Sequence, residues 1–405
     1  MDMKQALAGI KVLAVAQVVA APFAAYQLAM HGADVISVEN PEAGDSARTA
    51  TDANAELILL GMSRLFLSFN ANKRAMTLRI NTPEGQAVFR TLAKNADVVI
   101  ENLRGGTMAR YGIGYEDLRK INPGIIFASV TGYGQTGPKK NDPAIDGAIQ
   151  AASGMMSITG TAETGPLKTG SVIVDYTTGY VTALAIALAL YQRSNTGMGQ
   201  AIDVAMLETA MTLMSGEVVR ALTGGGTPPR VGNALSSGGY VSNTYPCKEG
   251  FIAIAAVPEA RRAKLWQAMN RPDIPVDPRF AKPAEARLNM QALDAEIVRT
   301  LSERTAQEWE GILNKAGVAA MEVRQLADAV HQPQLEHRHF FHQFDGDPGI
   351  GVPPFSVPTA AYRMSDSPMQ IKSMPPRMGQ HTDEVLAENG FSKEEIARLH
   401  AQGTV

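Results

Sequence analysis

The chain is predicted to be an α/β protein whose large domain holds a Rossmann-like, doubly wound parallel sheet, followed in sequence by a smaller α/β domain. Short apolar runs alternate with helix patterns in the N-terminal third of the chain, and this alternation is typical of βαβ units. Each apolar run is continuous, as expected of a strand that helices cover on both faces. A glycine- and serine-rich stretch then separates these units from a second region of strand and helix patterns.

The first βαβ unit opens with an apolar strand at residues 10–16. A helix is expected from Pro22, because proline suits the first helical turn, and Gly32 is expected to end it. Residues 34–38 form the second short apolar strand. The nearly uncharged stretch 12–30 is interrupted by polar residues and proline and is not preceded by a basic cluster, so neither a signal peptide nor a membrane span is predicted.

The same rhythm continues through two more pairs of helix and strand. Helix patterns at 83–94 and 115–121 lead into apolar strands at 97–101 and 125–130. Ligands of such sheets bind at the carboxyl ends of the strands. The segments that follow the strands, and that we expect to surround one crevice, are 16–21, 39–40, 102–104 and 131–137.

Long apolar helix patterns dominate the middle of the chain. Two of them cover residues 144–158 and 177–193, and a short strand at 201–204 leads into a methionine-rich helix at 206–214. We interpret those methionines as core residues, because the flexible thioether side chain mostly fills hydrophobic interiors.

A second set of elements follows the glycine-rich stretch. A strand at 251–256, three helices at 259–269, 290–303 and 306–315, and a last helix at 381–388 are predicted from the apolar patterns. The expected organisation is a large domain over 1–220, a glycine-rich loop over 221–240, a small α/β domain over 241–325, and a return segment over 326–405 that completes the large domain.

Composition excludes several classes of protein. The 405 residues are 45% hydrophobic and 19% charged, which excludes a disordered or fibrous chain. The formal net charge of -3, without a basic stripe, argues against a nucleic-acid partner. Cys247 is the only cysteine, which excludes a disulfide framework and is typical of a cytoplasmic protein. His337, His339 and His342 lack the spacing of a metal motif, so no metal site is predicted.

Asp175 is the candidate catalytic residue, because it stands in an otherwise uncharged stretch, 169–180, ahead of a long apolar helix pattern. An unpaired carboxylate taken out of water costs several kcal/mol. Two interpretations stay open. Aspartate is a common N-cap, and a helix that begins near Tyr176 would accept it in that role. A carboxylate in such a setting is also suited to nucleophilic catalysis.

A dinucleotide fits the predicted crevice poorly. The turn after the first strand, 17–22, contains no glycine, whereas the Rossmann fingerprint needs glycines for close approach of the pyrophosphate. Basic residues at 73–74 and at Arg79, Arg104 and Arg110 lie close to predicted strand ends and turns. Such a group of cations could bind the phosphates of a nucleotide-bearing cofactor without a glycine-rich loop.

Eight short motifs, spread in order over about 380 residues, carry a family resemblance. They are LAGIKVL at 7–13, GADVI at 32–36 with Glu39 and Gly44-Asp45 behind it, NANKR at 70–74, DVVIEN at 97–102, ASVTGYG at 128–134, QAASG at 150–154, GMGQ at 197–200 and GQHTD at 379–383. Together they resemble the class III CoA transferases, the group that includes formyl-CoA transferase and whose relatives include α-methylacyl-CoA racemase.

The resemblance implies the chemistry. Asp175 matches the family's nucleophilic aspartate, which attacks an acyl-CoA thioester, forms an acyl-aspartyl anhydride and then carries CoA as an aspartyl thioester. Every tetrahedral step develops an oxyanion and needs N–H donors close by. Gly238 and Gly239 resemble the family's glycine loop that closes over the intermediate, and a plain flexible linker is the alternative for this stretch.

The resemblance also implies a CoA site without a permanently bound cofactor, so coenzyme A or acyl-CoA enters as a substrate. The positions that match the family's CoA contacts are Val19, Ala20, Asn40, Leu78, Arg79, Asn102, Leu103 and Arg110. Formyl-CoA transferase has an arginine where this chain has Asn40, so one phosphate-directed cation is missing. Family members are interlocked homodimers in which each chain threads through a ring formed by its partner, and the segments 134–143 and 332–358 suit such connections.

Two other functions are weighed against CoA transfer. The racemases share the fold but abstract an α-proton with a histidine beside an aspartate. The matching pair here is Ile145 and Asp146, and Ile145 cannot exchange a proton; Asp146 orients a substrate or caps the helix that begins there. A CoA-binding protein without chemistry is the second alternative, and the acid at 175 speaks against it. The expected acceptor is a carboxylic acid, with small dicarboxylates such as succinate, mesaconate or citramalate as candidates.

Overall fold

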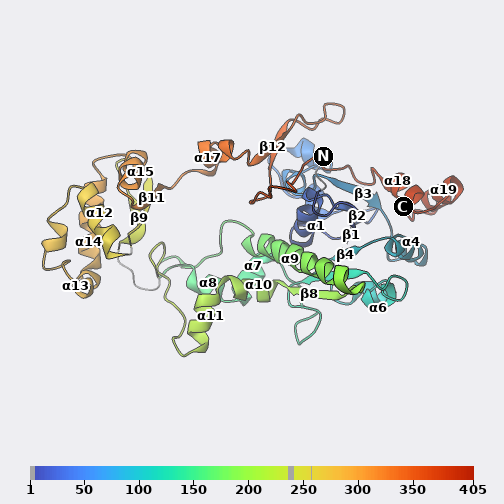
Figure 1. The fold of residues 1–405 in the computed structure, drawn as a ribbon, viewed down its shortest axis with the longest axis horizontal. Helices are drawn as coiled ribbons and strands as arrows, with labels where there is room; N and C mark the ends of the chain where they lie inside the picture. The colour runs from blue at the N-terminus through green and yellow to red at the C-terminus, as the bar shows by residue number, and fades with distance from the viewer. Residues whose placement is uncertain (1–4, 236–240, 257) are drawn as a thin grey trace. The chain divides into compact units, whose positions relative to one another are not determined.

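The computed structural model describes residues 5–235, 241–256 and 258–405, and the chain forms two compact units. The large unit comprises Met1–Ser153, Thr169–Ser215 and Gln334–Val405, and the small unit comprises Gly154–Lys168 and Gly216–Pro333. Both units are therefore discontinuous in sequence, because the chain leaves the large unit twice and returns to it each time. Figure 1 traces this path by colour from the N-terminus to the C-terminus.

A six-stranded sheet forms the centre of the large unit. Its strands, in spatial order, are β3 (Lys73–Thr77), β2 (Asp34–Glu39), β1 (Lys11–Val15), β4 (Val98–Glu101), β5 (Ile126–Thr131) and β8 (Ala201–Ala205). Every neighbouring pair is parallel. The predicted doubly wound sheet is thus confirmed as mixed α/β structure with a large parallel sheet, and its strand order reverses between β1 and β4. Ligands of open α/β sheets bind at such a switch point.

Helices cover both faces of this sheet. One face packs on α1 (Ala20–Met30) and α9 (Ile173–Thr196), with Ala25 and Ile186 among the buried contacts. The opposite face packs on α4 (Pro83–Lys94), α6 (Tyr115–Leu118), α18 (Thr382–Glu388) and α19 (Lys393–Ala401), with Phe89 and Leu386 in that core. The C-terminal segment therefore completes a layer that residues 83–118 begin. Figure 1 shows α1 beside α9, and α18 beside α19.

Shorter elements surround the sheet. They are η1 (Ser46–Thr49), α2 (Ala55–Leu59), α3 (Arg64–Leu67), α5 (Thr107–Arg110), α7 (Asp146–Ala152), α10 (Met206–Leu213) and the antiparallel pair β12 (Phe341–Phe344) and β13 (Phe355–Pro358). A third buried cluster joins α1, α2 and α3 to β12 and β13, with Tyr26 and Phe66 at its centre. Two helices lie where the chain passes between the units, namely α11 (Ser215–Leu222) and α17 (Pro333–His337).

The small unit is built on a three-stranded antiparallel sheet in the order β11-β10-β9. Its strands are β9 (Ser242–Pro246), β10 (Phe251–Ala255) and β11 (Ala319–Glu322), and its remaining elements are α8 (Met155–Ile158), β6 (Gly160–Thr161), β7 (Gly165–Pro166), α12 (Glu259–Ala268), η2 (Ile274–Val276), α13 (Pro283–Leu288), α14 (Met290–Leu301), α15 (Ala306–Lys315) and α16 (Leu326–Ala329). Buried residues of β10, α14 and α15 form its own core, which includes Ile254, Ile297 and Trp309.

Local sequence explains where several predicted elements begin and end. α4 has the predicted bounds, because the Thr82 hydroxyl accepts the N–H of Gly85 at 3.2 Å and Pro83 fills the first helical position. The helix expected over 144–158 is in fact two helices, α7 and α8. Gly154 separates them with a φ of 85°, a left-handed conformation that ends a helix. The helix expected from Pro22 begins two residues earlier, at Ala20.

Candidate active site

Two cavities open at the carboxyl ends of the parallel strands of the large unit. The first, which we call the strand-end cavity, has a volume of about 210 Å³ and is lined by residues that follow β1, β2, β3 and β4. The second, which we call the Asp175 cavity, has a volume of about 520 Å³ and is lined by the β1–α1 turn, the end of β5 and the starts of α7 and α9. Gln17 and Leu103 line both cavities, so the two are neighbours.

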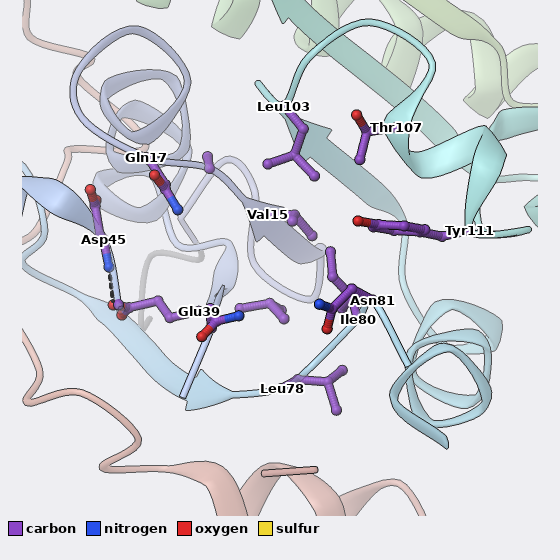
Figure 2. Close-up of a pocket in the computed structure, with 14 residues that line it drawn as sticks. Val15, Gln17, Glu39, Asp45, Leu78, Ile80, Asn81, Leu103, Thr107 and Tyr111 are labelled. Atoms are coloured by element: carbon purple, nitrogen blue, oxygen red, sulfur yellow. Dashed lines mark hydrogen bonds between the residues drawn. The ribbon is translucent and has the colours of Figure 1, made fainter. Parts of the chain in front are cut away.

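The strand-end cavity brings together three of the predicted CoA contacts, Asn40, Leu78 and Leu103. Figure 2 shows Leu103, Thr107 and Tyr111 on the side that follows β4, and Leu78 and Ile80 on the side that follows β3. The lining of described residues thus combines aliphatic and aromatic side chains with amide and hydroxyl groups and with the carboxylates of Glu39 and Asp45. Apolar side chains with a few polar groups among them are typical of small-molecule sites.

Asp175 lies within the first turn of α9, which begins at Ile173. The residue at the N-cap position is Val172, which has no capping side chain. The interpretation of Asp175 as an N-cap is therefore wrong, because the helix starts before it and its carboxylate is left to line the cavity. The structure thus leaves the carboxylate of Asp175 available for chemistry.

Asp146 supplies the missing cap of α9. Its Oδ2 accepts the backbone N–H of Val174 at 2.8 Å and of Asp175 at 3.1 Å, and its Oδ1 accepts a hydrogen bond from Gln150 Nε2 at 2.6 Å. Gln150 in turn bonds the backbone and side chain of Thr169. Asp146 stands at the first position of α7 but caps a different helix, which corrects the expectation that it caps its own.

The ionisation of Asp175 follows from this setting. Burial raises the pKa of Asp175 to about 7, and the negative charge of Asp146 adds to the rise. The positive end of the α9 helix favours an anion, but Asp146 already occupies the two N–H donors. A carboxylate with a raised pKa is more basic, and a more basic carboxylate is a stronger nucleophile once ionised.

The β1–α1 turn brings Val19 and Ala20 into the lining of the Asp175 cavity, as the family resemblance implied for the first turn. Asn102 holds this turn from β4. Its Oδ1 accepts the N–H of Gln17 at 2.9 Å, and its Nδ2 donates to the carbonyl of Gln17 at 2.8 Å. Asn102 also lines the cavity, but both ends of its amide are engaged with the backbone of the turn.

The two predicted arginine contacts lie elsewhere in this structure. Arg79 pairs with Glu42 at 3.0 Å and donates to the carbonyl of Gly403 at 2.9 Å, while Arg110 donates to Thr107 Oγ1 at 2.8 Å. Neither arginine is among the residues that line the two cavities. Arg110 is nevertheless tied to Thr107, which lines the strand-end cavity, so its charge lies one side chain away from that lining.

The basic residues at 73–74 are committed to internal partners rather than to a phosphate. Lys73 is 2% exposed, and its Nζ donates to the carbonyl of Pro22 at 2.8 Å and to Asn70 Oδ1 at 2.6 Å. Arg74 forms ion pairs with Asp34, Glu384 and Glu388 at 2.7–2.9 Å. Lys73 therefore ties β3 to α1 and to Asn70, and Arg74 ties β3 to β2 and α18, so the hypothesis that they bind phosphate is wrong.

Some residues of the site follow from no isolated sequence pattern. Gln17, Thr107 and Tyr111 line the strand-end cavity, and Asp146 caps the helix that carries Asp175, which lies 29 residues further along the chain. The position of Gln17 directly after the first strand was the available signal, since strand ends form the crevice. Ile145, which matches the histidine base of the racemases, lines the Asp175 cavity. Gly238 and Gly239 lie outside the described residues.

The chain matches the model of CoA-transferase family III over residues 7–382. It is 33% identical to succinate–glutarate CoA-transferase of Agrobacterium fabrum over 95% of this chain and 96% of that one. It is 31% identical to succinyl-CoA–D-citramalate CoA-transferase of Chloroflexus aurantiacus over 98% and 97%, and to succinyl-CoA:mesaconate CoA-transferase of Haloarcula marismortui over 95% and 96%.

Solved structures agree with these matches. A CAIB/BAIF family protein from Brucella suis superposes with a TM-score of 0.83 at 31% identity, over 95% of this chain and 100% of that one. The protein Rv3272 from M. tuberculosis superposes with a TM-score of 0.81 at 30% identity, over 94% and 98%. The fold, the full-length relatives and the match over residues 7–382 lead to one conclusion: this chain belongs to CoA-transferase family III, and it is an enzyme that transfers CoA from an acyl-CoA thioester to a carboxylic acid.

Proposed function

We propose that the enzyme transfers CoA between small dicarboxylic acids through covalent intermediates on Asp175. The observation that carries the proposal is the placement of Asp175, whose carboxylate lines a cavity next to the strand-end cavity, while the N–H groups of Val174 and Asp175 bond Asp146 instead. A ligand whose adenine end occupies the strand-end cavity can extend its thioester end past Gln17 toward Asp175.

Four steps complete one turnover. The Asp175 carboxylate attacks the thioester carbonyl, which forms an acyl-aspartyl anhydride and releases CoA thiolate. The thiolate attacks the Asp175 carbonyl, which releases the donor acid and leaves an aspartyl-CoA thioester. The acceptor carboxylate then attacks that thioester, which forms a second anhydride and again frees the thiolate. Attack of the thiolate on the acceptor carbonyl yields the new acyl-CoA and restores Asp175.

The first turn of α1 supports the oxyanions of these steps in this proposal. Val19 and Ala20 line the Asp175 cavity at the N-terminus of that helix, where backbone N–H groups lack partners within the helix. Such donors favour an anion more strongly than they favour a neutral carbonyl. The side chain of Gln17, which lines both cavities, is a further polar group beside the path of the thioester.

The choice of dicarboxylic acids rests on the relatives. Their names pair succinate or succinyl-CoA with glutarate, citramalate or mesaconate. The part of the Asp175 cavity that the described residues line contains no lysine or arginine; its side chains are mostly apolar, and the polar ones are Gln17, Asn102, Thr131 and the acids Asp146 and Asp175.

Trapping of the covalent intermediate tests the proposal. The protein is mixed with succinyl-CoA and a panel of acids, and hydroxylamine is added during turnover. We expect mass spectrometry to find the hydroxamate of Asp175 only when acyl-CoA is present, because only then is its carbonyl electrophilic. A monocarboxylic acid such as acetate serves as the control acceptor. Transfer without any modification of the Asp175 peptide would contradict the covalent route.

We also propose that the enzyme is a homodimer. On α9, the side chains of Leu184, Leu188 and Tyr191 are 62%, 60% and 72% exposed, and their spacing places them on one stripe of the helix. An exposed apolar stripe marks an interaction site. α9 is also long and apolar enough to cross a membrane by length and composition, but its other side packs on the sheet through Ile186. A second copy of the chain is therefore the partner that we propose.

Light scattering tests the dimer. We expect Leu188→Glu to raise the monomer fraction at micromolar concentration, because it places a charge in an apolar contact. Gln291→Glu, a charge change at an exposed polar position of another helix, α14, is the matched control. A parent protein that is monomeric and fully active would overturn this part of the proposal. A cytoplasmic location stays a prediction.

A further inference from the structure

The β1–α1 turn contains an unusual backbone conformation at Val18. Its φ of 65° lies in the left-handed region. Left-handed residues are mostly glycine, and a β-branched side chain at such an angle is a genuine outlier, because the side chain crowds the backbone. Val18 also lines the Asp175 cavity and is 42% exposed, so no tight packing of its own side chain forces this conformation. Strain of this kind persists only where the surroundings impose it.

Hydrogen bonds from two neighbouring segments impose it. The Oδ1 atom of Asp45 accepts the N–H of Val18 at 2.8 Å. One residue earlier, the side chain of Asn102 bonds both the N–H and the carbonyl of Gln17. The chain is therefore held on both sides of the Gln17–Val18 peptide, and the carboxylate of Asp45 is the group that fixes the left-handed residue.

Asp45 is itself held by a buried ion pair. Its backbone N–H donates to Glu39 Oε2 at 2.8 Å, and Arg48 forms two hydrogen bonds of 2.7 Å with the Glu39 carboxylate. The side chains of Arg48 and Glu39 are 4% and 3% exposed. Figure 2 shows the bond between Asp45 and Glu39 at the edge of the strand-end cavity. A rigid support of this kind can hold a strained turn because little of it can move.

We propose that Asp45 is a positioning residue for CoA transfer, which holds Val18 in the left-handed conformation and thereby directs Gln17 and the first turn of α1 into the two cavities. Gln17 precedes Val18 and lines both cavities, while Val19 and Ala20 follow it and line the Asp175 cavity. Rotation at Val18 would redirect the groups on both sides. The competing explanation is a local cap, because Asp45 Oδ1 also accepts the N–H of Ala47 at 2.9 Å and starts η1.

A double-mutant cycle separates the two explanations. Asp45→Ala is made in the parent and in Val18→Gly and Val18→Ala backgrounds, and kcat/KM for CoA transfer is measured in each. Glycine adopts a positive φ without cost, whereas alanine keeps the Cβ that opposes it. We expect Asp45→Ala to lower kcat/KM by about tenfold or more in the parent and in Val18→Ala, and by about threefold or less in Val18→Gly.

Two further variants sharpen the cycle. Asp45→Asn keeps an oxygen that accepts the N–H of Val18, so its activity is expected to exceed that of Asp45→Ala by about tenfold. Asp52 is the matched control, because it accepts the N–H groups of Asn54 and Arg64 in the same region but does not bond the β1–α1 turn. The effect of Asp52→Ala on kcat/KM is expected to be equal in the parent and in the Val18→Gly background.

Equal losses for Asp45→Ala in all three backgrounds would overturn the proposal and leave Asp45 as a cap of η1. If Asp45→Ala fails to fold, hydrogen exchange of the parent decides instead: we expect the amide of Val18 to be protected, and rapid exchange there overturns the proposal. The inference rests on the proposed function only through the assay. A failure of the covalent route would appear in the trapping of Asp175, whereas a failure of this inference appears only in the cycle.

Discussion

The Oδ2 atom of Asp146 accepts the backbone N–H of Asp175 at 3.1 Å, so one carboxylate caps the helix that carries the other. The same oxygen accepts the N–H of Val174 at 2.8 Å. Two acids of like charge are thereby held close together at the N-terminus of α9, and the more deeply buried of the two, Asp146, is 5% exposed. The arrangement raises the basicity of the Asp175 carboxylate and, at the same time, fixes the backbone of that residue.

The first prediction concerns the pH dependence of transfer. Because the reaction needs an ionised nucleophile and the pKa of Asp175 is raised to about 7, kcat/KM is expected to rise with pH through that value. Asp146→Asn removes the second cause of the shift and is expected to move this limb to lower pH. The limb remains above the ordinary range of aspartate, because burial is the larger cause.

Other groups titrate in the same range, so the variant is essential. Burial raises the pKa of Glu101 to about 7 and lowers that of Lys73 to about 7. Only a limb that belongs to Asp175 should respond to Asp146→Asn. Asp142→Asn is the matched control, since Asp142 is exposed and pairs with Lys139. An unchanged profile in Asp146→Asn would assign the limb to another group.

The second prediction separates the catalytic role of Asp175 from its effect on stability. Asp175→Asn is expected to reduce transfer to less than about 1% of the parent, because an amide cannot form the anhydride. Its free energy of unfolding is expected to exceed that of the parent above pH 7, since the variant buries no charge. Transfer at a substantial fraction of the parent rate would exclude the covalent mechanism.

The sign of that stability difference follows from linkage. The native pKa of Asp175 lies above the unfolded value of about 3.9, so the native state binds more protons between these values. The contribution of Asp175 to the free energy of unfolding is therefore fully present below pH 4, and it is lost as the pH rises through about 7. Urea unfolding of both proteins at pH 4 and pH 8 checks this, and the gap between them is expected to widen only at pH 8.

The third prediction concerns the close contact of α1 with α9. A Cβ atom added at Gly179 would lie 2.8 Å from the carbonyl oxygen of Ala20 and 2.8 Å from Phe23 Cδ1. Gly179→Ala is therefore expected to destabilise the protein by about 1–3 kcal/mol. In Gly311→Ala, within α15, the new Cβ meets nothing within 4 Å, so this control is expected to be neutral or stabilising. Urea unfolding measures both.

The fourth prediction concerns the buried ion pair beneath the β1–α1 turn. Arg48→Met removes the partner of Glu39 and leaves a buried carboxylate unpaired, which is expected to destabilise the protein by about 3–5 kcal/mol. Arg299→Met removes an exposed partner of Glu296 and is expected to cost less than about 1 kcal/mol. Equal midpoints of urea unfolding for the two variants would show that burial does not set the strength of the Arg48 pair.

Local sequence signals predicted most of the parallel sheet. The continuous apolar runs located β1, β2, β4, β5 and β8 to within a residue or two, because buried strands are almost uniformly apolar. β3 was missed. It begins with Lys73 and Arg74, which are typical of a solvated turn, and each of them has a partner 40 or more residues away in sequence, Pro22 for Lys73 and Asp34 for Arg74. No local pattern reports such pairings.

The residues of the candidate site were likewise predicted only in part from the sequence. Asp175 could be found from the sequence, since an acid in an apolar stretch needs an explanation. Its role as a cap was wrong because the cap comes from Asp146, which is distant in sequence. The positions after the strands gave Asn40 and Leu103 a common crevice, and the family resemblance added Leu78, which lines the same cavity. The direction of Arg79 depends on the distant partner Gly403, which sequence reasoning does not supply, whereas Arg110 bonds Thr107 three residues before it.

The two hydrogen bonds between the side chain of Asn102 and the backbone of Gln17 lie where the strand order of the sheet reverses, between β1 and β4. The side chain of Asn102 thereby extends the hydrogen-bond ladder between β1 and β4 by one residue beyond the strands. Without these bonds the loops that follow β1 and β4 could move apart and widen the crevice between them. The two bonds keep the width of the crevice constant at this point. On the proposed route the thioester passes Gln17, which lines both cavities and whose backbone these two bonds hold in place. We therefore expect acids of different length to be distinguished on the far side of Asp175, where the acyl group would end.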